Sequence, residues 1–335
     1  MEERILRAHG IGGGMTQELI AGVFVEAFDD PTLRLLEDSA VLRMEASRLA
    51  FTTDSFVVSP LFFKGGDIGK LAVCGTVNDL AVMGATPRYL SVSFILEEGL
   101  EIATLKRVVG SMATTAKEAD VRIVAGDTKV VERGSGDGVF ITTTGIGAVS
   151  AGLEISAANA KTGDKVILNG PIGNHSIAVL SEREGLRFTS SIASDCAPLN
   201  KLVAAMLELD GGIHCMRDVT RGGLATVLNE IAASSGKGII LEEERIPVDE
   251  DVFAACEMLG LDPLYMANEG KLVTIVAPED ADQVLAAMKA NPYGREAAII
   301  GSVVAGPEGQ VRMNTSIAGQ RIVTTHAGEE LPRIC

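Results

Sequence analysis

The stretch GDIGKLAVCGTVNDLAVMG, residues 66–84, is the starting point for interpreting the fold of this 335-residue chain. Its apolar residues recur at helical spacing, and Asp67 near its start belongs to a residue type that caps helices. We therefore predict a helix here, lying between strands at 49–57 and 89–96. Asp79 interrupts the apolar sequence of this helix, and a carboxylate in such a setting is costly to bury without a partner.

The first half of the chain continues outward from this helix as a mixture of helices and strands. Further strands are predicted at 41–46, 122–131 and 138–149, and further helices from about residue 17 and over 102–119. A glycine-rich run at 134–138 predicts a turn between the last two of these strands.

The second half repeats this mixed pattern after residues 161–164, where we predict a domain junction. The predicted strands are 165–168, 213–216, 238–241, 272–276 and 298–303. The predicted helices are 199–209, 223–233 and one that follows a turn at 169–174. Because helices do not strictly alternate with strands, the pattern favours two α+β domains over a doubly wound sheet. The length of the chain also suits two domains.

Charge and hydropathy exclude several classes of protein. The net charge is −16, from 45 acidic and 29 basic residues, and such a surface repels nucleic-acid phosphates. No apolar stretch approaches the roughly 20 residues that cross a bilayer. The N-terminus is acidic and lacks the features of a signal peptide. We therefore expect a cytoplasmic protein that binds neither nucleic acid nor membrane.

The five cysteines are widely spaced, odd in number and form no C-x-x-C pair. This spacing argues against a disulfide framework and against a zinc site. Cys74 and Cys215 lie within apolar segments, so we expect them to be buried and inert.

Five aspartates stand beside apolar or small residues and are candidates for a metal–nucleotide site. They are Asp38, Asp54, Asp79, Asp127 and Asp218. Taken singly, each is explained as a helix cap, a turn residue or an ion-pair partner. Several converging carboxylates would repel one another unless a hard cation joined them, and oxygen-only ligation suits Mg²⁺. Together they favour a site for Mg²⁺ and a nucleotide.

The glycine-rich run at 10–14 fits such a site. Backbone amides without side chains can approach phosphates closely, and Gly12, Gly13 and Gly14 offer three in succession. The run matches neither a P-loop nor a dinucleotide fingerprint. A flexible N-terminal hinge explains it equally well.

Three further polar residues have ordinary structural explanations. Lys129 and Glu269 stand beside turn-type residues, where a solvated surface charge is the default. His175 follows a turn and is interpreted as a residue at the start of a helix, not as a catalyst.

The sequence finishes with Cys335, preceded by Pro332, Arg333 and Ile334. Pro332 stiffens the approach to the thiol, and Arg333 supplies a nearby positive charge. A tail starting at residue 327 could extend roughly 30 Å, enough to carry a thiol-linked group between two active sites. The alternative is that the tail is frayed and has no function.

Four motifs together resemble the aminoimidazole-ribonucleotide-synthetase-like superfamily of ATP-dependent enzymes, which includes selenophosphate synthetase and thiamine-monophosphate kinase. Within it the chain resembles the HypE family of hydrogenase maturation proteins most closely, on the glycine run and the final Pro-Arg-Ile-Cys. The four motifs are TTDS at 52–55, NDLAVMGA at 78–85, AGDTK at 125–129 and RDVTRGG at 217–223. The resemblance covers nearly the whole chain.

The resemblance implies two mixed α/β-sandwich domains and a homodimer in which N-terminal sheets pair, with nucleotide near the interface. The expected organisation is a glycine-rich loop and helix at 1–35, an ATP-binding domain at 36–155, an α+β domain at 156–325 and a mobile tail at 326–335.

The resemblance also implies an activity and a set of site residues. HypE-like proteins receive a carbamoyl group on the terminal cysteine from HypF, dehydrate it with ATP and pass cyanide to the HypC–HypD complex. By motif, Cys335 is the expected carrier, with Lys129 and Glu269 as joint base and proton relay. The expected Mg²⁺ ligands are Asp38, Asp79 and Asp218. The expected nucleotide-site residues are Gly12, Gly13, Gly14, Asp54, Asn78, Asp127 and Thr128.

Two other functions stay open from the residues. One is another ATP-dependent synthetase or kinase of the superfamily. A selenophosphate synthetase would carry a reactive cysteine in the glycine run, and none is present at 10–14. The other is a nucleotide-binding scaffold whose terminal thiol only docks a partner, which would bind ATP without consuming it.

Overall fold

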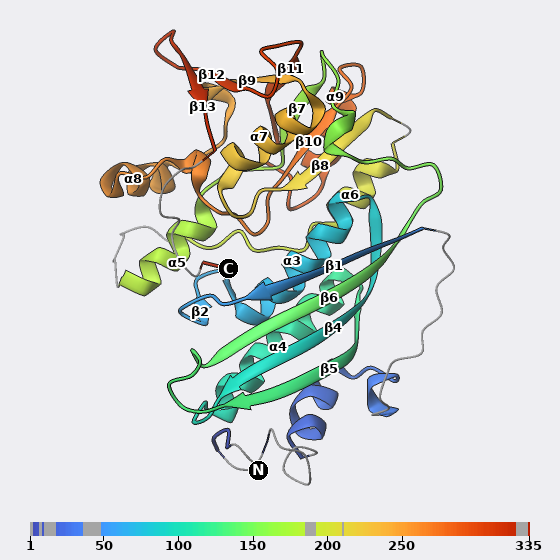
Figure 1. The fold of residues 1–335 in the computed structure, drawn as a ribbon, viewed down its shortest axis with the longest axis vertical. Coiled ribbons are helices and arrows are strands. Elements are labelled where there is room, and N and C mark those ends of the chain that lie inside the picture. The colour runs from blue at the N-terminus through green and yellow to red at the C-terminus, as the bar shows by residue number, and fades with distance from the viewer. Residues whose placement is uncertain are drawn as a thin grey trace.

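A computed structural model of the chain describes residues 3–6, 9, 18–35, 48–184, 192–209, 211–325 and 334–335. Two sheets dominate it, a four-stranded one from the first half of the chain and a seven-stranded one from the second (Figure 1). Both are mixed with helices, so the predicted α+β class with two mixed domains is confirmed. Among the described residues, no helix combines the length and the apolar character needed to span a membrane.

The four-stranded sheet has the order β1-β6-β4-β5. Its strands are β1 (Arg48–Phe56), β4 (Ala85–Glu97), β5 (Arg122–Val131) and β6 (Val139–Val149). The predicted glycine turn at 134–138 does connect β5 to β6. These two strands are not neighbours, however, because β4 lies between them and pairs with both.

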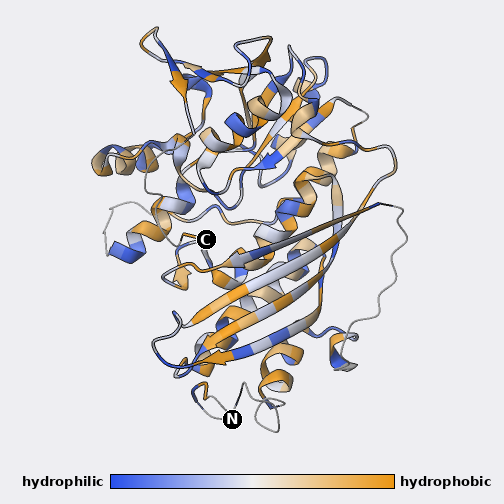
Figure 2. Cartoon of the chain, in the orientation of Figure 1, coloured by the Kyte–Doolittle hydropathy of each residue, from blue (hydrophilic) through white to orange (hydrophobic). Residues whose placement is uncertain are grey.

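Helices α3 (Ile68–Val82) and α4 (Ile102–Ala119) cover one face of this sheet. The α3 helix is apolar on almost every side, as expected for a helix buried all round. Its N-terminus is capped as predicted, since Asp67 Oδ1 accepts hydrogen bonds from Gly69 N at 2.8 Å and Lys70 N at 3.2 Å. No described element covers the opposite face, which Figure 2 shows toward the viewer, with polar and apolar residues alternating along the strands.

The N-terminal helical segment packs against α4 and β5. It consists of η2 (Ile20–Val25), α2 (Glu26–Phe28) and η3 (Leu33–Leu35). Phe24 contacts Phe94 of β4 with ring centroids 4.8 Å apart. The helix predicted from about residue 17 is therefore present, whereas the glycine run at 10–14 and the predicted strand at 41–46 lie outside the described residues.

The seven-stranded sheet has the order β13-β12-β9-β11-β7-β10-β8. Its strands are β7 (Lys165–Leu168), β8 (Ile213–Asp218), β9 (Gly238–Glu242), β10 (Leu272–Val276), β11 (Ala298–Val304), β12 (Val311–Asn314) and β13 (Gln320–Val323). The sequence prediction missed the short hairpin of β12 and β13, whose four-residue strands carry too little pattern.

Helices cover both faces of this second sheet. Val273 and Ile275 share a buried cluster with α7 (Gly223–Ser235). Leu272 and Val276 share another with α6 (Asn200–Leu207) and α9 (Ala281–Ala290). Strand β10 is therefore buried on both sides, which explains its continuous apolar sequence.

Two more helices, α5 (Asn174–Glu184) and α8 (Glu250–Leu259), pack against each other beside this sheet. A small hairpin of β2 (Phe62–Phe63) and β3 (Gly66–Asp67) lies next to α5. The sequence prediction did not include α8 or α9. Figure 1 shows the C-terminal residues beside α5 and β2, between the two sheets.

Candidate functional site

Three of the predicted aspartates come together where the two sheets meet. Asp54 lies on β1, Asp79 on α3 and Asp218 at the end of β8. Thr52 Oγ1 donates a hydrogen bond of 2.8 Å to Asp79 Oδ2. Burial and the neighbouring Asp79 carboxylate raise the pKa of Asp54 to about 6. Burial and the same neighbour raise the pKa of Asp218 to about 7.

Glu269 lies with these aspartates, so that Asp54, Asp79, Asp218 and Glu269 form an acidic cluster. Glu269 is only 3% exposed. Burial raises its pKa well above the ordinary value, and Cys196, Asp195, Asp218 and Asp54 add to the effect. The default interpretation of Glu269 as a solvated surface charge is therefore wrong, because the fold buries it among other acids.

The amide of Glu269 is held by the carboxylate of Asp195, which is itself paired with Lys271. Asp195 accepts hydrogen bonds from Glu269 N at 3.1 Å and Gly270 N at 3.3 Å, and Lys271 Nζ lies 3.1 Å from the same carboxylate. The pKa of Asp195 is lowered even though burial opposes this, because Lys271 supplies a compensating positive charge. Sequence reasoning missed Asp195, which stands in a segment without periodicity and gave no local signal.

Asn78 connects α3 to the same segment. Its Oδ1 accepts from Leu199 N at 2.7 Å, and its Nδ2 donates to the carbonyls of Ala197 at 3.1 Å and Glu269 at 3.4 Å. The residue is 3% exposed. Both polar atoms of the Asn78 side chain, a residue predicted for the nucleotide site, thus join the two halves of the chain.

The donor set fits Mg²⁺ in its chemistry. The clustered side chains offer only oxygen atoms, and burial, with the neighbouring Asp79 carboxylate second, raises the pKa of Asp54 and Asp218; a cation would offset both effects. Within the described ranges, no three His, Cys, Asp or Glu side chains are already arranged to hold a metal ion. Asp38, the remaining predicted ligand, falls outside those ranges, as do Gly12, Gly13 and Gly14.

Asp127, Thr128 and Lys129 lie elsewhere, on edge strand β5. Lys129 Nζ is 3.2 Å from Asp127 Oδ1, and both side chains are about two-thirds exposed, at 66% and 60%. Thr128 N donates to the same Oδ1 at 2.9 Å.

The register of the sheet separates Asp127, Thr128 and Lys129 from the acidic cluster. Asp127 pairs with Ser93, Ser93 with Thr142, and Thr142 with Ser55. Three strand spacings, roughly 14 Å, therefore lie between Asp127 and β1. Asp54, one residue before Ser55, points to the opposite face of the sheet. Within one chain, the structure does not bring Lys129 to Glu269.

The C-terminal residues Ile334 and Cys335 dock near the acidic cluster. Val57 N donates to the main-chain oxygen of Cys335 at 3.1 Å, and Nε2 of His175 lies 2.9 Å from the Ile334 carbonyl oxygen. Ile334 is 5% exposed, whereas Cys335 is partly exposed. His175 does stand at a helix start, as predicted, but it also contacts the tail.

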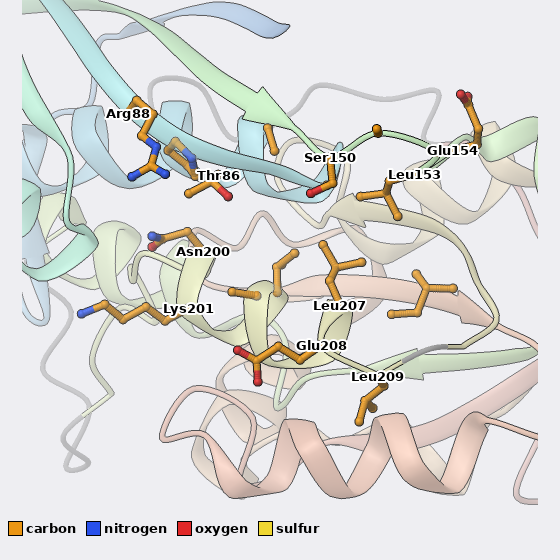
Figure 3. A pocket seen from close by; sticks show the side chains of 18 of the residues that line it. Thr86, Arg88, Ser150, Leu153, Glu154, Asn200, Lys201, Leu207, Glu208 and Leu209 are labelled. Carbon is orange, nitrogen blue, oxygen red and sulfur yellow. The ribbon is translucent and has the colours of Figure 1, made fainter. Parts of the chain in front are cut away.

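A cavity of about 870 Å³ opens in a different place, between β4 and α6 (Figure 3). Arg88, Asn200 and Lys201 are among its lining residues. None of the predicted site residues lines this cavity. The candidate active site is therefore the acidic cluster near the docked C-terminus.

Comparison with known proteins identifies the family. Residues 36–149 match the N-terminal domain of the AIR synthase related protein family, and residues 161–314 match its C-terminal domain. The carbamoyl dehydratase HypE of Cupriavidus necator is 56% identical over 333 residues, which cover 99% of this chain and 95% of that protein.

Solved structures agree with this assignment. A crystal structure of the hydrogenase maturation protein HypE in complex with ATP has a TM-score of 0.95 and 48% identity, covering 98% of this chain and 99% of that one. The structure of a HypE–HypF complex contains a chain with a TM-score of 0.81 and 51% identity, covering 92% and 99%. By sequence and by fold, the chain belongs to the HypE family of carbamoyl dehydratases that act in hydrogenase maturation.

Proposed function

We propose that this protein carries a carbamoyl group on Cys335 and dehydrates it with ATP to a thiocyanate, the cyanide source for a NiFe-hydrogenase iron centre. The observation that supports this most directly is the docked C-terminus. The main-chain oxygen of Cys335 accepts a hydrogen bond from Val57 N, three residues beyond Asp54. Three residues of extended chain span about 10 Å, so the main chain of Cys335 docks at about that distance along the chain from Asp54.

ATP is required because an S-carboxamide does not readily lose water. Transfer of the γ-phosphoryl group to the amide oxygen forms an O-phosphorylated imidate and ADP. Loss of that oxygen as phosphate, with two protons leaving the nitrogen over the whole sequence, forms the C≡N bond. The chain must therefore hold the nucleotide near the carbonyl carbon and provide a base near the nitrogen.

Asp38, Asp79 and Asp218 would hold Mg²⁺, with Asp54 close by. Gly12, Gly13, Gly14 and Asn78 complete the proposed nucleotide site on the same chain. Asp127 and Thr128, three strands away on β5, would join it from a second copy of the chain. When bound, Mg²⁺ would offset charge on the transferring phosphoryl group. A similar HypE was crystallised with ATP, which supports ATP as the nucleotide.

Glu269 is the proposed base on this chain, because it is the most buried carboxyl of the group. A carboxyl whose pKa is raised by burial is a stronger base once ionised, and general bases typically contribute about 10²–10⁴-fold. Asn78 and Asp195 would fix its backbone relative to the docked tail.

Lys129 is the proposed partner of Glu269, and it would have to come from a second copy of the chain. The uncovered face of the four-stranded sheet carries Lys129 together with Phe51, which is 72% exposed, and Leu49, which is 50% exposed. Pairing of two such faces in a homodimer would cover this apolar surface. It would also bring edge strand β5 of one protomer to edge strand β1 of its partner, the strand that carries Asp54.

The proposed partners follow from the same reaction. A HypF-type carbamoyltransferase would load Cys335, which the similar HypE–HypF complex supports. A HypC–HypD complex would accept the cyanide. The domain limits 1–35, 36–155, 156–325 and 326–335, and a cytoplasmic location, are proposed with this function.

Intact mass measurement tests the proposal. The protein is incubated with a HypF-type transferase, carbamoyl phosphate and Mg-ATP. The expected result is the gain of one carbamoyl group followed by the loss of one water, both absent in Cys335→Ala. An unmodified Cys335 in the presence of an active transferase would refute the carrier role. Carbamoylation without dehydration, and without ATP consumption, would instead favour a nucleotide-binding scaffold.

A further inference from the structure

We infer that His175 is a positioning residue, a latch that holds the main chain of Ile334 and Cys335 in the docked position. His175 is fully buried in α5, and its Nε2 lies 2.9 Å from the Ile334 carbonyl oxygen. Val57 N donates to the main-chain oxygen of the next residue, Cys335, at 3.1 Å. The main-chain oxygens of two successive tail residues are therefore bound, one by each half of the chain.

The hydrogen-bond partners determine the tautomer of His175. The Ile334 carbonyl can only accept, so Nε2 carries the proton and donates it. The pKa of His175 is lowered by burial, which favours the neutral ring and leaves Nδ1 as an acceptor. Ser194 Oγ, 2.8 Å from Nδ1, then donates its proton, and it accepts in turn from Cys196 N at 3.1 Å. The ring thus has a defined partner on each nitrogen.

Packing fixes the plane of the ring as well. Phe63 of β2 meets the His175 ring edge-on, with centroids 5.4 Å apart and an interplanar angle of 82°. The backbone of Ser194 is held by Lys64 of the same hairpin, since Ser194 N donates to the Lys64 carbonyl at 2.8 Å. His175 is thus oriented by surrounding structure before the tail arrives, as a preorganised docking group requires.

The latch is connected to the proposed base. Ser194 precedes Asp195, whose carboxylate accepts hydrogen bonds from the backbone of Glu269 and Gly270. One short segment therefore orients both the histidine that binds the tail and the acid that would act on it. His175 would in this way set the position of the carrier thiol relative to Glu269, an inference that rests on the proposed carrier role of Cys335.

The latch binds main-chain atoms. The hydrogen bonds from His175 and Val57 both end on main-chain oxygens, so neither depends on the group that Sγ carries. The carbamoylated substrate and the thiocyanate product should consequently dock equally well at this point.

Alkylation of Cys335 by iodoacetamide measures docking directly. The other four cysteines, Cys74, Cys196, Cys215 and Cys256, are at most 2% exposed, so the folded protein should react at the tail. We expect iodoacetamide to alkylate Cys335 about fivefold faster in His175→Ala than in the wild type. The reason is that the loss of one hydrogen bond lowers the docked population by about this factor. His175→Gln, which keeps a donor near the Nε2 position, should restore most of the protection. His214→Gln, the matched control at a histidine outside the latch, should react like the wild type.

A single-turnover assay on carbamoylated protein is the second arm. Dehydration should slow in His175→Ala and recover in His175→Gln, while carbamoyl loading by the transferase stays unchanged in both. Ser194→Ala should give a smaller effect in the same direction, and it serves as the test if His175→Ala does not fold. Wild-type alkylation and dehydration rates in folded His175→Ala, or in folded Ser194→Ala if that variant must replace it, would overturn the latch. If Cys335 is never carbamoylated in the wild type, the carrier role fails, yet the alkylation rates still decide whether His175 docks the tail.

Discussion

At the scale of single residues, the site is a set of acids whose surroundings work against ionisation. Asp54 and Asp218 have pKa values raised to about 6 and about 7, first by burial and then by Asp79. Such an arrangement is stable only when protons or a cation offset the charge. A residue that serves binding in this way lowers the stability of the empty protein.

Replacing Asp218 tests whether this acid lowers the stability of the empty protein and serves Mg-ATP binding. We expect Asp218→Asn to stabilise the protein without nucleotide by about 1–2 kcal/mol at pH 7, because a carboxyl with a raised pKa costs free energy when ionised. Mg-ATP should raise the thermal midpoint of the wild type and leave the variant unchanged. Denaturation with and without Mg-ATP measures both effects. A variant less stable than the wild type, yet still shifted by Mg-ATP, would show that Asp218 is a structural residue.

At the scale of elements, close backbone contacts decide where the functional side chains lie. Gly270 follows Glu269, and a Cβ added there would lie 1.9 Å from the Asp195 carbonyl oxygen. The segment 194–197 and the loop before β10 are thus packed backbone against backbone. The sequence shows a glycine at this place but cannot show what it approaches.

Gly270→Ala should therefore separate Glu269 from Asp195. We expect a loss of at least about 2 kcal/mol in unfolding free energy and a large fall in dehydration rate, since backbone cannot move aside cheaply. Gly170→Ala is the matched control, because its Cβ would meet only the Lys271 side chain at 3.6 Å. Urea denaturation and single-turnover dehydration measure the two effects. Equal behaviour of the two variants would contradict the close contact.

The N-terminal helical segment is held by one buried acid. Asp30, 4% exposed, accepts hydrogen bonds from Arg122 Nε at 2.6 Å and from Thr32 N at 2.7 Å. These hydrogen bonds lower its pKa, although burial opposes the change. This stabilisation is present above the unfolded pKa near 3.8 and is lost as the pH falls through the lower folded value.

Asp30→Asn should lower the unfolding free energy by about 1.5–3 kcal/mol at pH 7, the usual contribution of hydrogen bonds to a charged group. The difference from the wild type should shrink below about pH 4, where the unfolded acid is protonated too. Asp29→Asn, at the exposed neighbouring carboxylate, should change stability little. Urea denaturation over a pH series measures these differences, and a pH-independent loss would rule out the charge as its cause.

At the scale of the whole molecule, the fold divides the proposed machinery between opposite sides of one sheet. The acidic cluster and the docked tail lie on the helix-covered side. Lys129 lies on the uncovered side, on β5 at the edge opposite β1. A second copy of the chain is the proposed means of bringing them together. Activity should then depend on pairing of two protomers.

Subunit complementation tests this dependence. Lys129→Ala and Glu269→Gln should each be inactive alone, while an equal mixture after subunit exchange should recover about a quarter of wild-type turnover. Half of the dimers would be mixed, and each would contain one intact site. Adding Phe51→Arg to both variants should abolish the recovery by disrupting the uncovered face. No recovery in a mixture shown to contain mixed dimers would place Lys129 in its own chain's site or outside catalysis.

The sequence by itself determined many of the elements, and it determined the family. The helix over 102–119 and the strands at 122–131, 165–168 and 272–276 have the observed limits, because periodicity, glycines and polar boundaries are local properties. The four motifs and the terminal cysteine were also sufficient to indicate the family, which the comparisons confirm.

Tertiary structure alone decided which residues meet. It placed β4 between β5 and β6, buried Glu269, recruited Asp195 and gave His175 its contact with the tail. The contact of Asp195 with Glu269 joins residues 74 positions apart, and that of His175 with Ile334 joins residues 159 positions apart. No local spacing encodes such contacts. They arise because burying both sheets against their helices brings distant segments together, where each buried polar group must find a partner.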